Sequence, residues 1–220
     1  MKKIILLLIL LLLLTGCKNI GQIENGYTNF GNLDLPQFKP PRKGEEIAMI
    51  ITNKGEIKIK LLDEIAPIAV EQFKKWVGEG KYEGCYFGSI SKDRNIMING
   101  KGYRRDMTEE EGSKYYADII GNMSFDEGYE LETSPDYHNF SGTVGFAHYE
   151  DRPVGLFYIV ANEGLSEELL ELFDVLSDKL GFTRDVIKAY RHLGGVLEYI
   201  GKREKGSNLC ASTLESAITD

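Results

Sequence analysis

GCYFGSISKDRNIMINGKG, residues 84–102, holds two short apolar runs that are separated by the polar turn KDRN and followed by glycines. Short apolar runs bounded by polar residues and glycine are typical of paired β-strands. FSGTVGFAHYEDRPVGLFYIVAN, residues 140–162, has the same shape, with apolar runs at Thr143–Ala147 and Leu156–Ala161 on either side of a polar turn. Paired in one sheet, these four runs would form the wall of an apolar groove, and the functional hypothesis depends on that groove.

The amino terminus predicts export and a lipid anchor. Lys2 and Lys3 precede an unbroken apolar run, and the residues Leu14-Thr15-Gly16-Cys17 follow it. A short basic region, an apolar core and a small-residue cleavage site describe a signal peptide. The cysteine makes this one resemble bacterial lipoprotein signals, although an ordinary signal with a chance cysteine is the alternative. We expect a signal at residues 1–16, lipid and palmitate on Cys17, and a chain on the outer face of the cell membrane.

Composition narrows the classes of partner. The chain has 220 residues and a formal net charge of −8, so removal of the signal leaves about 200 residues, enough for one domain with a full core. An acidic exported chain lacks the basic face that nucleic-acid binding needs. Three histidines, His138, His148 and His192, have no metal-ligand spacing, so no metal or cofactor is expected. Cys85 and Cys210 could pair outside the cell, but two cysteines do not make a disulfide framework, and the favoured interpretation is that Cys85 is a small buried apolar residue. We expect a monomer.

The elements around the groove can be taken in chain order. Residues 17–44, rich in Asn, Gly, Pro and Lys, predict a tether, and residues 45–62 alternate like a hairpin with one buried face. Pro67 opens a helix that has Trp76 in the core. The inward residues expected for these elements are Ile47, Met49, Ile51, Ile57, Ile59 and Leu61 in the hairpin and Val70, Phe73 and Val77, with Ala69 beside them, in the helix.

The second half of the chain is less regular. Residues 103–137 are acidic and rich in tyrosine, and we interpret them as surface loops with one short strand. Their carboxylates suggest calcium, but a solvated face is the favoured interpretation because EF-hand spacing is absent. Helices are predicted at residues 166–180 and from Thr183 to Leu193. Residues 196–220 form an atypical tail in which no element is predicted.

The ordered motifs resemble the cyclophilin-type peptidyl-prolyl isomerases over residues 45–162, and members with a helical insertion resemble residues 163–195. The matching motifs are Asn53-Lys54-Gly55-Glu56-Ile57, Ala66-Pro67, Val70-Glu71-Gln72-Phe73, Tyr82-Glu83-Gly84, Ile96-Met97-Ile98-Asn99-Gly100, Phe125-Asp126-Glu127, Gly142-Thr143-Val144-Gly145-Phe146-Ala147 and Phe157-Tyr158-Ile159-Val160. The resemblance implies a mainly β fold, an antiparallel barrel with a capping helix. The domain would span residues 45–195. The family's closing strands are absent from the tail, so the barrel is expected to be incomplete; a shifted reading frame near Gly195 is one explanation.

The resemblance also implies a site, with one departure. The family places an arginine in Phe-His-Arg near the prolyl amide, and here that tripeptide is Phe87-Gly88-Ser89. Ser89 and Asn99, which stands for the family's Gln, take the catalytic positions, and Arg94 is either a substitute or a solvated turn residue. The substrate-binding positions that carry over are Phe87, Ile96, Met97, Ala147, His148, Leu156 and Tyr158.

The function implied is isomerisation of X-Pro bonds in exported, proline-containing polypeptides, with activity weakened or lost. The barrier is about 18–20 kcal/mol because the amide is conjugated, and loss of a preorganised donor costs on the order of 10²–10³ in rate. The alternative is a non-catalytic module or chaperone at the membrane that binds proline segments. A decayed copy that does not fold stably is a third possibility.

Overall fold

The computed structural model describes residues 23–24, 27–28, 33–90, 95–125, 129, 132, 134, 136–149, 152–161, 170–171, 182–195 and 212–216. The predicted signal, Cys17, Arg94, Cys210 and nearly all of the helix predicted at 166–180 lie outside these residues. Among the described residues, no helix combines the length and apolar character that a bilayer span requires.

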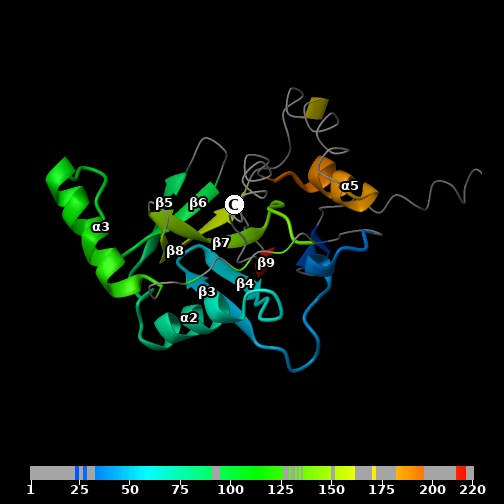
Figure 1. The fold of residues 1–220 in the computed structure, drawn as a ribbon, viewed down its shortest axis with the longest axis horizontal. Coiled ribbons are helices and arrows are strands. Elements are labelled where there is room, and N and C mark those ends of the chain that lie inside the picture. The colour runs from blue at the N-terminus through cyan, green and yellow to red at the C-terminus, as the bar shows by residue number, and fades with distance from the viewer. Residues whose placement is uncertain are drawn as a thin grey trace, which may run out of the picture.

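The architecture is an antiparallel sheet with few helices (Figure 1), which confirms the mainly β prediction. Its seven strands run in the order β3-β4-β9-β7-β8-β6-β5. Their bounds are β3 Ile47–Thr52, β4 Gly55–Lys60, β5 Tyr86–Ile90, β6 Asn95–Asn99, β7 Thr143–Tyr149, β8 Arg152–Val160 and β9 Ser212–Ser216. Two short strands, β1 Ile23–Glu24 and β2 Tyr27–Thr28, pair with each other separately. Both predicted groove stretches therefore form hairpins, β5–β6 and β7–β8, and β6 pairs with β8 to join them.

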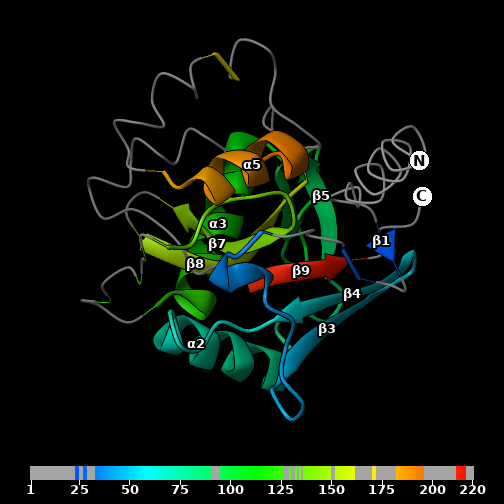
Figure 2. The same cartoon turned by 90° about the vertical axis from the view of Figure 1, so that its right-hand side faces the viewer.

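The carboxyl-terminal tail differs from the prediction. Strand β9 lies between β4 and β7 (Figure 2), pairing Ile59 with Leu214 and Thr143 with Thr213. The expectation that residues 196–220 hold no element is therefore wrong for 212–216. The sequence STLES has only one large apolar residue, so apolar pattern does not predict this strand. Its place in the sheet depends on backbone pairing with β4 and β7.

The hairpin of β3 and β4 has the predicted turn but a different buried face. Ile57 and Ile59 are buried, whereas the predicted inward residues Ile47, Met49 and Ile51 are 47%, 50% and 72% exposed. The register pairs Ile50 with Ile57, and cross-strand partners share a face. The turn at Asn53-Lys54 therefore puts the even-numbered residues of β3 opposite the odd-numbered residues of β4, and Ile50 packs on the core.

Helix α2, Pro67–Gly78, begins with proline in its first turn as predicted. Its buried residues are Ala69 and Trp76, and Phe73 packs against the core between them. Val77, predicted to point inward, is 52% exposed. The inward stripe therefore follows positions 69, 73 and 76, one residue out of phase with the expected one.

Helix α3, Glu109–Met123, replaces the surface loops predicted at residues 103–137. Thr108 accepts a hydrogen bond from the Glu111 N–H, and the Glu111 carboxylate accepts one from the Thr108 N–H, which is a capping box. Tyr115, Ile119 and Met123 are buried along one side of the helix. The sequence signal for this helix is the pattern T-x-x-E followed by apolar residues four positions apart.

The capping box predicts a pH-dependent contribution to stability. The Thr108 backbone N–H, followed by the Arg104 guanidinium, lowers the pKa of Glu111. A carboxyl group with a lowered folded-state pKa stabilises above its unfolded pKa, about 4.3, and that contribution disappears as pH falls through the folded value. We expect Glu111→Gln to have a lower Tm than the parent chain at pH 7, and the two melting curves to converge below about pH 4. A gap that stays constant from pH 7 to pH 3 would contradict this.

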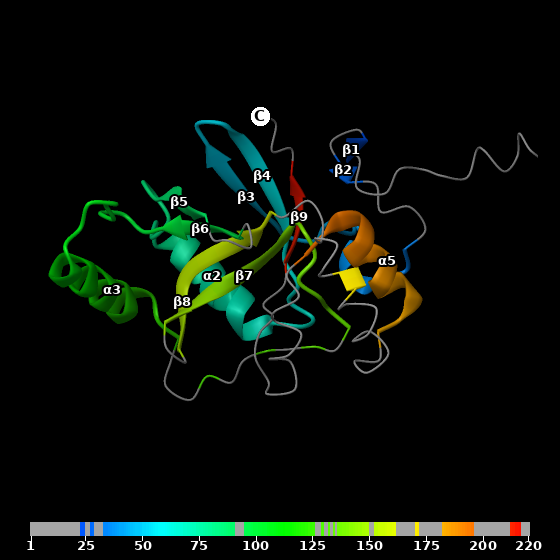
Figure 3. The ribbon, with the colours of Figure 1, turned by 90° about the horizontal axis from the view of Figure 1, so that it is seen from above.

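A second apolar cluster forms away from the main core. Helix α5, Arg184–Leu193, has the predicted Thr183 cap and ends at Gly194. Its buried residues pack with Phe140, with Phe38 of the 3₁₀ turn η1, Pro36–Phe38, and with Leu35, which immediately precedes that turn. The prediction that 17–44 is a tether is thus wrong for this part of the segment, because residues 33–38 dock on α5. Figure 3 places α3 and α5 at opposite ends of the sheet.

Candidate functional site

The strand register brings predicted site residues into one row across four strands. Ser89 of β5 pairs with Met97 of β6, Met97 pairs with Tyr158 of β8, and Tyr158 pairs with Gly145 of β7. We call these four residues the cross-strand row. Because cross-strand partners share a face, the row lies on the face opposite to Ile98 and Phe157, which belong to the core.

The row is closely packed at its β7 end. A Cβ atom at Gly145 would lie 2.7 Å from the phenol oxygen of Tyr158, so the tyrosine side chain lies directly over the glycine. Tyr158 is only 6% exposed. A side chain at position 145 would displace that ring, which explains the glycine at the centre of a strand.

A β-bulge adjoins the other end of the row. The register of β5 with β6 shifts between Phe87 and Ser89, which leaves Gly88 as the extra residue. A Cβ at Gly88 would lie 2.6 Å from the Tyr86 ring and 2.8 Å from Oδ1 of Asn99. Asn99 is almost fully buried, and its amide oxygen therefore borders the bulge.

An arginine that the sequence analysis did not select reaches this bulge. The Arg105 Nη2 group donates a hydrogen bond to the Gly88 carbonyl oxygen at 2.9 Å. Arg105 lies in the segment between β6 and α3, 16 residues after Ser89 in the chain. No local pattern marks it, because its proximity to β5 depends on how residues 100–108 fold back.

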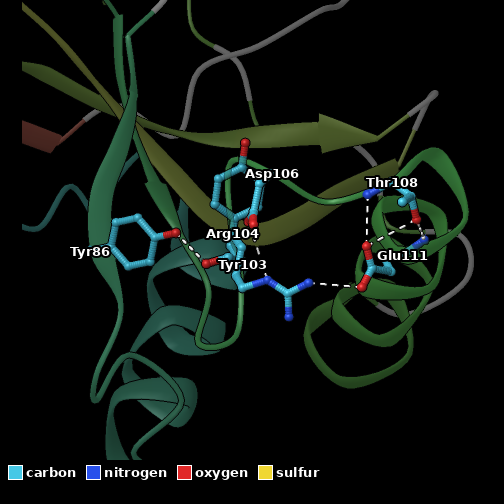
Figure 4. A network of polar contacts seen from close by, with 6 residues as sticks. All are labelled: Tyr86, Tyr103, Arg104, Asp106, Thr108 and Glu111. Atoms are coloured by element: carbon cyan, nitrogen blue, oxygen red, sulfur yellow. Dashed lines mark hydrogen bonds and ion pairs between the residues drawn. The ribbon is translucent and has the colours of Figure 1, made fainter.

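A polar network holds that segment in place (Figure 4). The Tyr86 hydroxyl donates to the Tyr103 carbonyl. Arg104 donates to Glu111 at 2.9 Å and forms an ion pair with Asp106 at 3.4 Å. The network therefore connects strand β5 at one end and the cap of α3 at the other, with Arg105 between them.

The other predicted substrate-binding residues are divided between two faces. Phe87 pairs with Ile98 and packs on the core, its ring 6.2 Å from that of Phe157, and Ile96 pairs with the buried Ile159. By register these two positions share the face of Ile98, opposite to the cross-strand row, and their role in substrate binding stays a prediction. Ala147 is buried in the main core cluster, and His148 pairs with Pro153 after a register shift in β7.

Leu156 is covered by helix α3. Leu156 is 2% exposed and belongs to one cluster with Tyr115 and Ile119 of the helix. A Cβ at Gly100 would be 2.8 Å from both Ile119 Cδ1 and the Tyr115 hydroxyl and 3.6 Å from Leu156 Cδ2. The predicted groove is therefore closed at its Leu156 end, and the cross-strand row together with the Gly88 bulge forms the remaining candidate site.

Two titratable groups that pack in the main core near the site have raised pKa values. Burial raises the pKa of Tyr115 to about 12 and also raises the pKa of the Cys85 thiol, so both stay protonated at neutral pH. In the described part of the chain, no group of three or more His, Cys, Asp or Glu side chains could hold a metal ion. A cavity of about 40 Å³ lies between α2 and the sheet, but its lining includes none of the predicted site residues.

Comparisons with known proteins identify the family of the chain. The family model for cyclophilin type peptidyl-prolyl cis-trans isomerase/CLD matches residues 47–172. A protein of Staphylococcus saprophyticus, provisionally named peptidyl-prolyl cis-trans isomerase, is 30% identical over 164 residues, which cover 74% of this chain and 75% of the relative. Similarly named proteins of Staphylococcus epidermidis and Staphylococcus aureus are 27% identical over the same share.

The chain also resembles solved structures. A cyclophilin type peptidyl-prolyl cis-trans isomerase of Cryptosporidium parvum, crystallised in the presence of the dipeptide Ala-Pro, has a TM-score of 0.38 and 20% identity. The match covers 53% of this chain and 68% of that one. On the strength of the family model and the staphylococcal relatives, this chain belongs to the cyclophilin-type peptidyl-prolyl cis-trans isomerase family.

Proposed function

We propose that the chain is a membrane-anchored peptidyl-prolyl isomerase that acts on proline-containing segments of exported polypeptides. Family membership supports the reaction type, and the cross-strand row supports the site. The observation that carries the proposal is the pairing of Met97 with Tyr158, with Tyr158 seated over Gly145. In this proposal, Met97 and Tyr158 would together hold the proline ring. We also propose that the seven-stranded sheet curves into the family's barrel.

The chemistry required of such a site is limited. Rotation about the X-Pro bond breaks amide conjugation but forms no covalent bond, so the catalyst has to stabilise the twisted amide relative to the planar one. An apolar surface holds the ring, and a hydrogen-bond donor stabilises the twisted form. Ser89 provides no cation at the position where the family has one, so the proposed activity is slow unless another donor reaches the row.

The membrane anchor is proposed from the sequence at residues 14–17. Cys17 would be the lipidated amino terminus, which would hold the domain at the outer face of the membrane. Metabolic labelling with a radioactive palmitate, comparing the parent chain with Cys17→Ser, tests this. We expect label on the parent chain alone; labelling of both proteins would contradict a lipid at Cys17.

Isomerase activity is tested with the full chain in detergent micelles. We expect it to accelerate cis–trans exchange of an Ala-Pro-containing peptide, measured by NMR exchange spectroscopy, and to accelerate refolding of a protein limited by a prolyl bond. Heat-denatured chain is the control. Peptide binding without acceleration would replace the proposal by a non-catalytic binding module, and absence of both binding and acceleration would reject both.

A further inference from the structure

We propose that Arg105 is the cationic donor of this site and contacts the substrate's prolyl amide. The inference rests on the proposed function, since it assigns a residue to the isomerisation described above. It adds a catalytic residue from the segment between β6 and α3, outside the strands that carry the cross-strand row.

The geometry places the guanidinium at the edge of the row. Arg105 Nη2 is 2.9 Å from the carbonyl oxygen of Gly88, and Gly88 immediately precedes Ser89 in the bulge. A peptide unit joins that carbonyl to Ser89, so the guanidinium lies within one residue of the row. Ser89 in turn pairs with Met97.

Arg105 keeps donors available for a ligand. A guanidinium carries five N–H groups, and one of them is used by Gly88. Arg105 is exposed, and within the described residues no carboxylate lies within ion-pair distance of it. Its neighbour Arg104 is by contrast committed to Asp106 and Glu111. The sequence thus places two adjacent arginines in different roles, one holding the segment and one facing the bulge.

The chemistry follows from what twisting does to an amide. When the X-Pro bond rotates, conjugation is lost and the nitrogen lone pair becomes localised. A localised lone pair accepts a hydrogen bond that the planar amide cannot accept well. A cationic N–H donor held beside the ring therefore stabilises the transition state more than the ground state and raises kcat.

A structural role for Arg105 predicts different behaviour from a catalytic one. If the residue only fastens the β5 bulge, any N–H donor of similar reach would suffice. Arg105→Gln keeps an amide N–H for the Gly88 carbonyl but removes the charge, and Arg105→Lys keeps the charge but removes the planar fork. Lys114→Ala is the charge-matched control, because Lys114 is exposed on α3 and no contact places it near β5.

The test measures kcat and KM of the full chain on the Ala-Pro peptide for the parent and the four variants, including Arg105→Ala. We expect kcat to fall on the order of 10²-fold in Arg105→Ala and Arg105→Gln, with KM nearly unchanged, a smaller loss in Arg105→Lys, and parental values in Lys114→Ala. An active parent with equally active Arg105→Gln overturns the catalytic role, leaves the proposed function standing, and decides the question even if Arg105→Ala unfolds. An inactive parent overturns both proposals.

Discussion

Replacing Trp76 by alanine is expected to lower the free energy of unfolding by about 4 kcal/mol, within the range for large-to-small changes in a core. Trp76 is 2% exposed, and its ring packs edge-on against Phe125 at 5.4 Å and Phe146 at 5.8 Å. A Cβ at Gly155 of β8 would be only 2.9 Å from Trp76 Cε3, so the indole touches the sheet directly. Truncation leaves a cavity where α2 meets β7 and β8.

The measurement is urea denaturation followed by far-ultraviolet circular dichroism, since the variant loses the only tryptophan of the chain. Val77→Ala is the matched control: it is the next residue of the same helix and 52% exposed, and its cost should stay within about 0.5 kcal/mol. Similar costs for the two variants would show that α2 packs through another face. A chain with total stability of about 5–15 kcal/mol would keep only a fraction of it in Trp76→Ala.

The elements nearest to strong local signals could be predicted from the sequence. Pro67 at the start of α2, the turn at Asn53-Lys54 and the Thr183 cap of α5 all form where the sequence places them. Which side chains of those elements point toward the core could be predicted less accurately. β3 alternates isoleucine and methionine with other apolar residues on both faces, so Ile50 and Ile51 are equivalent in the sequence, and the register with β4 decides between them.

Helix α3 shows a different kind of error. Its capping box, Thr108 with Glu111, is visible in the sequence, whereas the weak periodicity and acidic composition of residues 103–137 favour a loop interpretation. Carboxylates in the first turn of a helix are in fact stabilising, because they oppose the positive end of the helix dipole.

The candidate site could be predicted only where it follows strand register. Met97, Tyr158 and Ser89 lie in one row because β5 pairs with β6 and β6 pairs with β8 within the one sheet that the sequence predicts. Arg105 could not be predicted in this way: its contact with Gly88 depends on the path of residues 100–108 in space. Leu156 matched a family position by sequence, but helix α3 covers it.

Replacing Phe140 by alanine is expected to lower the free energy of opening the second cluster by about 4 kcal/mol, so that this cluster opens before the main sheet. Phe140 is fully buried, and its ring centroid is 5.2 Å from that of Phe38 and 4.6 Å from that of Tyr190. It thus joins η1, which precedes β3 in the chain, to α5, which follows β8. No described residue of β7 or β8 belongs to that cluster.

Hydrogen exchange read by mass spectrometry distinguishes local release from global loss. In Phe140→Ala the amides of residues 184–193 and 35–38 should exchange faster than in the parent chain. The amides of β6 and β8 should exchange as slowly as in the parent chain, because Phe157 and Ile159 belong to the main core. Lys188→Ala, an exposed change on the same helix, should leave the pattern unaltered. Equal acceleration in both regions would show that the two clusters unfold as one unit. The segment at 33–38 would then be part of the cyclophilin-type domain itself, and truncating it as though it were a tether would destabilise the cross-strand row.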